Sequence, residues 1–171
     1  MSSTDVGRAT SKQMAEPGVI DMGLEVVTLP VSDVDRSKSF YQSLGWRLDA
    51  DLAVGDDFRV VQFTPTHSQS SIQFGKGLTS AEPGSVDRLF LAVKDIDSAR
   101  DDLISRGVDV SEVYHYERRP GHSAEMEARV SGPDPQKGRS YLTYASFRDP
   151  DGNGWLLQEV TTRFPGWERD D

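Results

Sequence analysis

Residues 26–35 read VVTLPVSDVD, and residues 88–97 read RLFLAVKDID. The shift that places residue 88 on residue 26 also superimposes the acidic residues of the two stretches and the glycines that follow them: Asp33 on Asp95, Asp35 on Asp97 and Gly45 on Gly107. A repeat at a fixed offset indicates two copies of one supersecondary unit. We therefore expect the chain to contain two modules of the same topology.

Each copy has the alternation of a strand followed by the signals of a helix. Every second residue is apolar, which is typical of a strand with one buried face: Val27, Leu29 and Val31, then Leu89, Leu91 and Val93. The aspartates that follow are N-cap candidates, because a carboxylate can accept backbone N–H bonds. The predicted helices cover about 34–44 and 96–106 and end at glycines. Their predicted buried residues are Phe40, Tyr41 and Leu44, then Ala99, Leu103 and Ile104.

Length and composition limit the class of protein. A chain of 171 residues can form one compact domain or two small fused modules. The absence of cysteine excludes disulfides and thiolate chemistry and fits a cytoplasmic protein. A net charge of −9 argues against nucleic acid or an anionic membrane as partner. No stretch of the sequence has the length and hydropathy of a membrane span or a signal-peptide core.

The remaining segments complete the two modules. We expect flexible tails at 1–21 and 164–171, a first module over about 22–76 and a second over about 86–163. The predicted strands are 23–31, 46–53, 58–64 and 71–75, then 87–94, 108–116, 140–147 and 155–160. The stretch 117–139 is predicted to be irregular, and its length is that of a functional lid or an insert. Each module is thus predicted as βαβββ.

This organisation resembles the vicinal oxygen chelate superfamily, which includes glyoxalase I, extradiol dioxygenases, fosfomycin-resistance enzymes and bleomycin-binding proteins. The resemblance rests on the two modules, on the V-x-D-[V/I]-D turn before each helix, on Phe40–Tyr41, and on Asp149–Pro150–Asp151–Gly152–Asn153 before the last strand. It covers about residues 22–163. It implies an α+β, glyoxalase-like fold in which two half-barrels enclose a pocket, and it implies a homodimer.

Metal-dependent members of that superfamily carry ligands at four inward positions on the first and last strands of the modules. The corresponding residues here are Val26, Gln73, Arg88 and Leu156, or Leu157 if the last strand is shifted by one. A hard divalent ion needs oxygen or imidazole ligands, and an arginine repels it. We therefore expect no metal in the usual seat and no other cofactor.

Polar and aromatic residues on the predicted lining face are candidate site residues. Arg88 could bind an anionic or carbonyl-bearing ligand by a forked contact, form an internal salt bridge with Glu159 or another acid, or lie at a strand end near solvent. Gln73 could orient a ligand or bond to Gln158. His115 is a candidate proton shuttle, whereas His67 and His122 lie in polar loops. The predicted ligand-binding set is Thr28, Gln73, Arg88, Phe90, Tyr114 and Gln158.

Three functions remain open from the sequence. The first is a protein that binds or acts on a small organic molecule, such as an aromatic carbonyl compound or a natural product, without metal. As an enzyme it would use Arg88 to polarise a carbonyl, Gln73 to orient it and His115 to transfer a proton. The second is a non-catalytic, drug-binding resistance protein. The third is a metal-dependent glyoxalase or dioxygenase with displaced ligands such as Gln73, His115 and Glu159.

Overall fold

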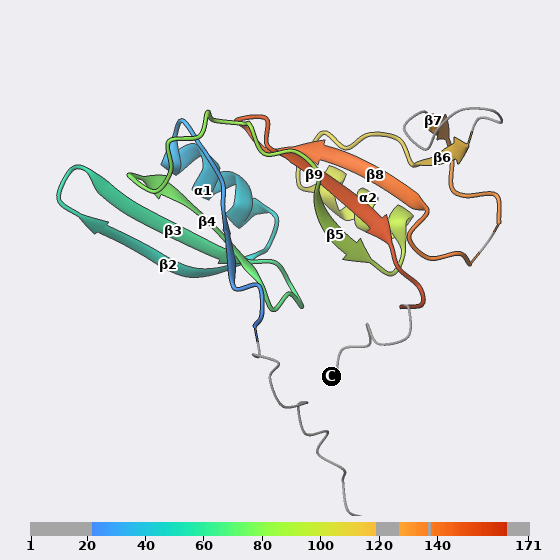
Figure 1. The fold of residues 1–171 in the computed structure, drawn as a ribbon, viewed down its shortest axis with the longest axis horizontal. Helices are drawn as coiled ribbons and strands as arrows, with labels where there is room; N and C mark the ends of the chain where they lie inside the picture. The colour runs from blue at the N-terminus through green and yellow to red at the C-terminus, as the bar shows by residue number, and fades with distance from the viewer. Residues whose placement is uncertain (1–21, 119–126, 137, 164–171) are drawn as a thin grey trace, which may run out of the picture.

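The computed structural model describes residues 22–118, 127–136 and 138–163, so the predicted tails at 1–21 and 164–171 lie outside the described residues. Figure 1 shows two twisted sheets side by side, each with one helix packed on it. The two halves follow each other along the chain, as the repeat predicts. The fold is α+β and glyoxalase-like, as expected, with a sheet of four strands and a sheet of five.

The first module forms a four-stranded sheet in the order β1-β4-β3-β2. Strand β1 runs parallel to β4, and the other neighbours are antiparallel. The predicted elements are all present; the first strand is shortened from the predicted 23–31 to three residues, and the others change only slightly at their ends. Their bounds are β1 (Val26–Thr28), α1 (Val34–Ser43), β2 (Arg47–Val54), β3 (Phe58–Thr64) and β4 (Ser71–Lys76).

The second module repeats this plan in the order β5-β9-β8-β6-β7, with β5 parallel to β9. Its elements are β5 (Leu89–Val93), α2 (Ile96–Ser105), β6 (Tyr114–Arg118), β7 (Glu127–Ser131), β8 (Thr143–Arg148) and β9 (Gly154–Glu159). Strand β7 has no counterpart in the first module, so the prediction of an irregular 117–139 is wrong there. The predicted strand 108–116 is also partly wrong, because Val110 makes an isolated bridge and the strand begins at Tyr114.

The helix termini follow the predicted chemistry. The Asp33 carboxylate accepts bonds of 3.0 Å from the backbone N–H groups of Asp35 and Arg36. Asp95 accepts a bond of 2.8 Å from the N–H of Ser98. Both stop glycines have positive φ, +76° at Gly45 and +84° at Gly107, where a side chain would be strained.

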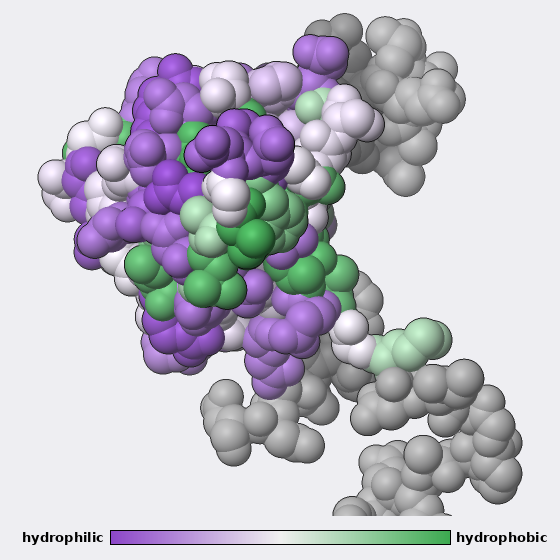
Figure 2. Space-filling model, turned by 90° about the vertical axis from the view of Figure 1, so that its left-hand side faces the viewer, coloured by the Kyte–Doolittle hydropathy of each residue, from purple (hydrophilic) through white to green (hydrophobic). Residues whose placement is uncertain are grey.

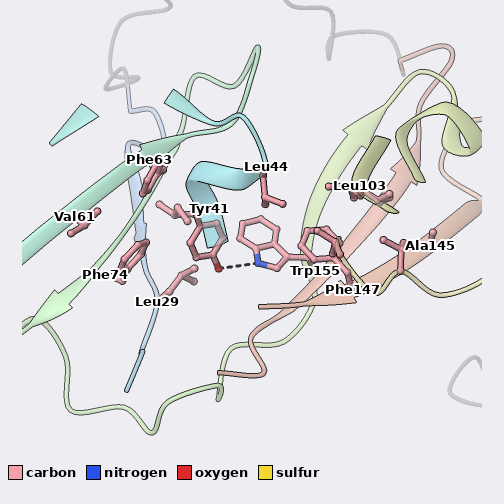
Figure 3. Packing of buried hydrophobic residues seen from close by; sticks show 14 of the residues in the cluster. Leu29, Tyr41, Leu44, Val61, Phe63, Phe74, Leu103, Ala145, Phe147 and Trp155 are labelled. Atoms are coloured by element: carbon pink, nitrogen blue, oxygen red, sulfur yellow. Dashed lines mark hydrogen bonds between the residues drawn. The ribbon is translucent and has the colours of Figure 1, made fainter. Parts of the chain in front are cut away.

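One hydrophobic core joins the two modules (Figure 3). Tyr41 on α1 is fully buried, and its ring lies 5.4 Å from Phe74 of its own module and 6.2 Å from Trp155 of the other. Leu44 and Leu103 are also buried, as predicted, while Phe40 and Ala99 pack at the margin of the core. The prediction for Ile104 is wrong: this residue is 43% exposed on the outer side of α2.

The core uses only the face of each sheet that is turned toward the helices. The opposite face, called here the open face, carries alternate residues of the same strands. On the first sheet it includes Leu52, Val54 and Phe58, which are 61%, 71% and 40% exposed. Figure 2 shows hydrophobic residues gathered on this side of the molecule and surrounded by polar ones. These apolar side chains are unusually exposed for a monomeric surface.

Candidate functional site

A cavity of about 470 Å³ lies on the open face of the second sheet. Strands β9, β8 and β6 supply most of its walls, and their register aligns Leu156 with Ser146 on the open face. The residues between these along the strands point toward the core, and two of them, Phe147 and Trp155, also border the cavity. The cavity is lined by Asp87, Arg88, Asp109, Ser111, Tyr114, Tyr116, Ser146, Phe147, Arg148, Gly154, Trp155 and Leu156.

Three tyrosines form an aromatic group at one end of this cavity, and two of them, Tyr114 and Tyr116, line it. The ring of Tyr114 stacks on Tyr144 at 5.8 Å, and Tyr116 meets both rings edge-on at 5.6 Å. The guanidinium of Arg129 on β7 lies 3.7 Å from the centre of the Tyr114 ring, a cation–π contact. Burial raises the pKa of Tyr114, and neighbouring Tyr116 adds to this shift, so the Tyr114 hydroxyl is neutral at physiological pH.

Arg88 immediately precedes β5, is exposed, as expected for a strand end near solvent, and lines the same cavity. Its backbone has φ of +60°, in the left-handed region that non-glycine residues avoid. The predicted salt bridge with Glu159 does not form, because Glu159 instead accepts the backbone N–H of Ile96 at 3.1 Å. Arg88 makes no hydrogen bond or ion pair with the residues that the structure describes.

The other cation of the cavity is already bound within the chain. Arg148 lies 3.6 Å from the carboxylate of Asp87 and donates to the carbonyl of Gly152 at 2.5 Å. Asp109 is the second carboxylate of the lining and is exposed. The cavity therefore presents one cation, Arg88, and one carboxylate, Asp109, that have no ion-pair partner among the described residues.

The predicted glutamines bond within their own modules. Gln73 donates to the hydroxyl of Thr28 at 2.8 Å on the open face of the first sheet, away from the cavity lining. Gln158 donates to the carbonyl of Tyr141 at 3.1 Å, so the expected bond between the two glutamines is absent. Phe90 lies beside Leu156 and is 54% exposed.

His115 lies on β6 between two cavity tyrosines, and alternation turns it to the other face of the sheet. Its ring is buried, with Nδ1 2.8 Å from the carbonyl of Gly132 and Nε2 3.3 Å from Glu117. The bond to Gly132 raises the pKa of His115, and burial opposes it. The residue connects β6 to the segment after β7 and does not reach the cavity.

The side chains at the usual metal positions do not fit a divalent ion. Val26 and Leu156 offer no donor atom, Arg88 is cationic, and Gln73 supplies a single amide. The displaced set of Gln73, His115 and Glu159 is not brought together, since each bonds elsewhere. Within residues 22–118, 127–136 and 138–163, no three histidine, aspartate or glutamate side chains lie close enough to hold a metal.

Sequence reasoning missed the cavity residue Tyr116 and two residues, Tyr144 and Arg129, that pack against Tyr114. Tyr116, Tyr144 and Arg129 were not among the predicted set, although the spacing of Tyr114 and Tyr116 on one strand places both on one face. Arg129 could not be found, because β7 was not predicted as a strand. In the part of the chain that the structure describes, no helix is long and apolar enough to cross a membrane.

Comparison with known proteins agrees with this architecture. The model of the Glyoxalase/Bleomycin resistance protein/Dioxygenase superfamily matches residues 23–157. TnmS3, an antibiotic binding protein from Streptomyces sp. CB03234, is 26% identical with a TM-score of 0.60, over 83% of this chain and 98% of that one. A glyoxalase/bleomycin resistance protein from the same organism is 28% identical with a TM-score of 0.57, over 80% and 100% of the two chains. No curated protein matches the sequence.

The superfamily match covers both modules, from before β1 to within β9. The two modules and their element order are those that the sequence resemblance implies, apart from the additional strand β7. The chain therefore belongs to the Glyoxalase/Bleomycin resistance protein/Dioxygenase superfamily.

Proposed function

We propose that the protein binds a small aromatic molecule in the cavity of the second sheet and releases it unchanged, without a metal. The observation that carries the proposal is the pair Tyr114 and Tyr116, which line a 470 Å³ cavity and are backed by the ring of Tyr144. Tyrosine faces offer large apolar contact area with little loss of side-chain freedom, and cavities of this size hold drug-sized ligands. The similarity to an antibiotic binding protein supports the same function.

The catalytic alternative has less support. It assigns carbonyl polarisation to Arg88 and proton transfer to His115, yet His115 lies on the opposite face of the sheet. General acid–base catalysis requires hydrogen-bond reach between the catalytic group and the reacting atom. A sequestering protein needs only the cavity and its aromatic wall.

We also propose that two copies pair and that the open face of the first module covers the cavity of the partner. Leu52, Val54 and Phe58 form an exposed apolar surface on that face, and exposed apolar patches of this kind mark interaction sites. Pairing would bring Gln73 and Thr28 to a cavity that their own module does not line. The absence of cysteine fits a cytoplasmic location.

The test is equilibrium binding followed by recovery of the ligand. The protein is titrated with anthraquinone derivatives and with bleomycin, tryptophan fluorescence reports binding, and mass spectrometry then examines the recovered compound. We expect saturable binding and an unchanged ligand. Conversion of the ligand during incubation would overturn sequestration in favour of catalysis.

A matched pair of variants tests the site. Tyr116→Ala removes one ring of the aromatic wall and is expected to weaken binding about tenfold. Ile104→Ala truncates a side chain of similar exposure on the outer side of α2 and should leave binding unchanged. Equal affinities for the two variants would place the ligand elsewhere.

A further inference from the structure

We infer that the cavity selects flat aromatic ligands that carry an anionic group, and that Arg88 binds this group. The inference rests on the proposed function, since it presupposes that the cavity takes an aromatic ligand. It adds the charge of the ligand and the residue that recognises it. Three features of the structure support it: the backbone of Arg88, the charges around it and its position relative to the tyrosines.

The backbone of Arg88 is held in a costly conformation. Its φ is +60°, and the Cβ of an L-residue crowds the following carbonyl there. Glycine, asparagine and aspartate tolerate this region, and arginine has no such advantage. Residues kept in strained conformations cluster at ligand-binding and catalytic sites, because the surroundings must hold them there. The conformation therefore points to a use for the Arg88 side chain.

The charges of the cavity leave Arg88 available. Asp87 and Arg148 face each other at 3.6 Å, and Arg129 lies over the ring of Tyr114. Arg88 has no acidic partner among the described residues, and the chain as a whole carries a net charge of −9. A protein this acidic repels anions in general, so an anionic ligand needs a local cation. A guanidinium can bind a carboxylate through two parallel hydrogen bonds.

The aromatic contact with the tyrosines and the ionic contact with Arg88 would lie in different parts of the cavity. Arg88 immediately precedes β5, while Tyr114 and Tyr116 come from β6, and all three residues line one cavity. The apolar side chain of Leu156 lies between them in the sheet order, on the strand next to β5. A ring system against the tyrosines can thus extend an acidic substituent toward Arg88.

The experiment compares two probes that differ in charge and hardly in shape. Anthracene-2-carboxylate and anthracene-2-carboxamide are titrated into the full chain, and dissociation constants are measured by fluorescence. We expect the carboxylate to bind at least about tenfold more tightly, as for a charge-assisted hydrogen bond. In Arg88→Ala this ratio should fall to about one, because the carboxylate loses the charge-assisted part of its contact.

The outcomes separate the inference from the proposed function. Binding of both probes with equal affinity would overturn the anion preference and leave aromatic binding intact. A preference that survives in Arg88→Ala would overturn the role of Arg88. Failure of both probes to bind would overturn the proposed function and the inference with it.

Stability gives a second, independent readout. Arg88→Gly removes the strain together with the cation, so we expect the melting temperature to rise by about 2–4 °C and the carboxylate preference to disappear. His67 has φ of +63° in an exposed loop outside the cavity. His67→Gly should therefore raise the melting temperature without changing the ratio of the two probes. A fall in the melting temperature of Arg88→Gly would show that Arg88 is kept for stability.

Discussion

The hydroxyl of Tyr41 on α1 donates a hydrogen bond of 2.8 Å to the carboxylate of Asp149, which precedes β9 in the other module. The same hydroxyl accepts a bond of 3.2 Å from the indole N–H of Trp155, drawn in Figure 3. Burial and the charge of Asp149 raise the pKa of Tyr41, which keeps the hydroxyl protonated as a donor. The two modules are thus joined by a buried polar contact inside their shared aromatic core.

Asp149 also organises the turn that carries the sequence resemblance. One carboxylate oxygen accepts the backbone N–H groups of Asp151, Gly152 and Asn153, each at 2.9 Å. The other accepts the side-chain amide of Asn153 at 2.8 Å, and that amide also donates to the carbonyl of Pro30 in the first module at 3.0 Å. The Asp-Pro-Asp-Gly-Asn sequence therefore serves as a junction between the modules as well as a turn.

Removing the Tyr41 hydroxyl should destabilise the fold. Tyr41→Phe keeps the ring but leaves the indole of Trp155 without an acceptor and takes one donor from Asp149. We expect the free energy of unfolding to fall by about 1–3 kcal/mol, as measured by urea denaturation. The matched variant Tyr116→Phe removes a hydroxyl from a ring that is 37% exposed and should cost less than half as much. Equal costs would contradict a structural role for the junction.

Gly84 in the segment between the modules should not tolerate a side chain. Its φ is +75°, and a Cβ would lie 2.1 Å from the carbonyl oxygen of Asp151. Gly84→Ala is expected to lower the unfolding free energy by more than about 2 kcal/mol. The backbone at residue 84 or at Asp151 would have to move to make room for the Cβ. Gly55 has φ of +62° with no atom within 4 Å of the added Cβ, so Gly55→Ala should cost only about 1 kcal/mol. The difference between the two costs measures the effect of the close contact at Gly84 separately from the effect of a positive φ.

The stability of the protein should depend on the protonation of His115. The carbonyl of Gly132 raises its pKa above the unfolded value, and Glu117 and Asp134 act in the same direction. A raised pKa means that this contribution is complete below the unfolded pKa and is lost as the pH rises through the folded pKa. Urea denaturation between pH 5.5 and 8.5 should show the advantage of the native protein over His115→Gln declining with pH. A constant difference would show that the protonated ring contributes nothing.

A charge on the open face of the first module should prevent pairing. Leu52 is 61% exposed there, and a glutamate in its place would be buried without a partner in a dimer. We expect Leu52→Glu to be monomeric by analytical ultracentrifugation under conditions where the native protein is a dimer. Ile104→Glu changes an exposed residue on the outer side of α2 and serves as the control. A monomeric native protein would refute the proposed dimer directly.

Much of the fold could be predicted because its signals are local. The aspartate caps, the stop glycines and the alternation of β3 each depend on residues within a few positions. Strand β7 could not be predicted, because its sequence EARVS is mostly polar and it forms by pairing with β6. Ile104 was misplaced for a related reason: which side of a helix meets the core depends on the sheet beneath it.

The candidate site was harder to predict from the sequence than the fold, because it depends on which open faces come together. Strand alternation alone places Arg88 and Tyr114 on a lining face, and the structure brings both to one cavity. The same reasoning put Gln73 beside Gln158, yet the chain keeps these two residues in separate modules. Alternation also distinguishes His115 from its neighbours, and a closer count along β6 would have turned it away from the cavity.

The separation of the core from the open faces affects how this protein can change over generations. Tyr41 and Phe74 belong to the core that joins the modules, and Trp155 belongs both to this core and to the cavity lining. Tyr116 also lines the cavity, but it is 37% exposed and lies outside that core. Substitutions at exposed positions cost little stability, so an exposed lining position such as Tyr116 can vary while the scaffold stays intact, whereas Trp155 is constrained by the core. If the cavity binds ligands as proposed, its range of ligands would change through exposed positions of this kind.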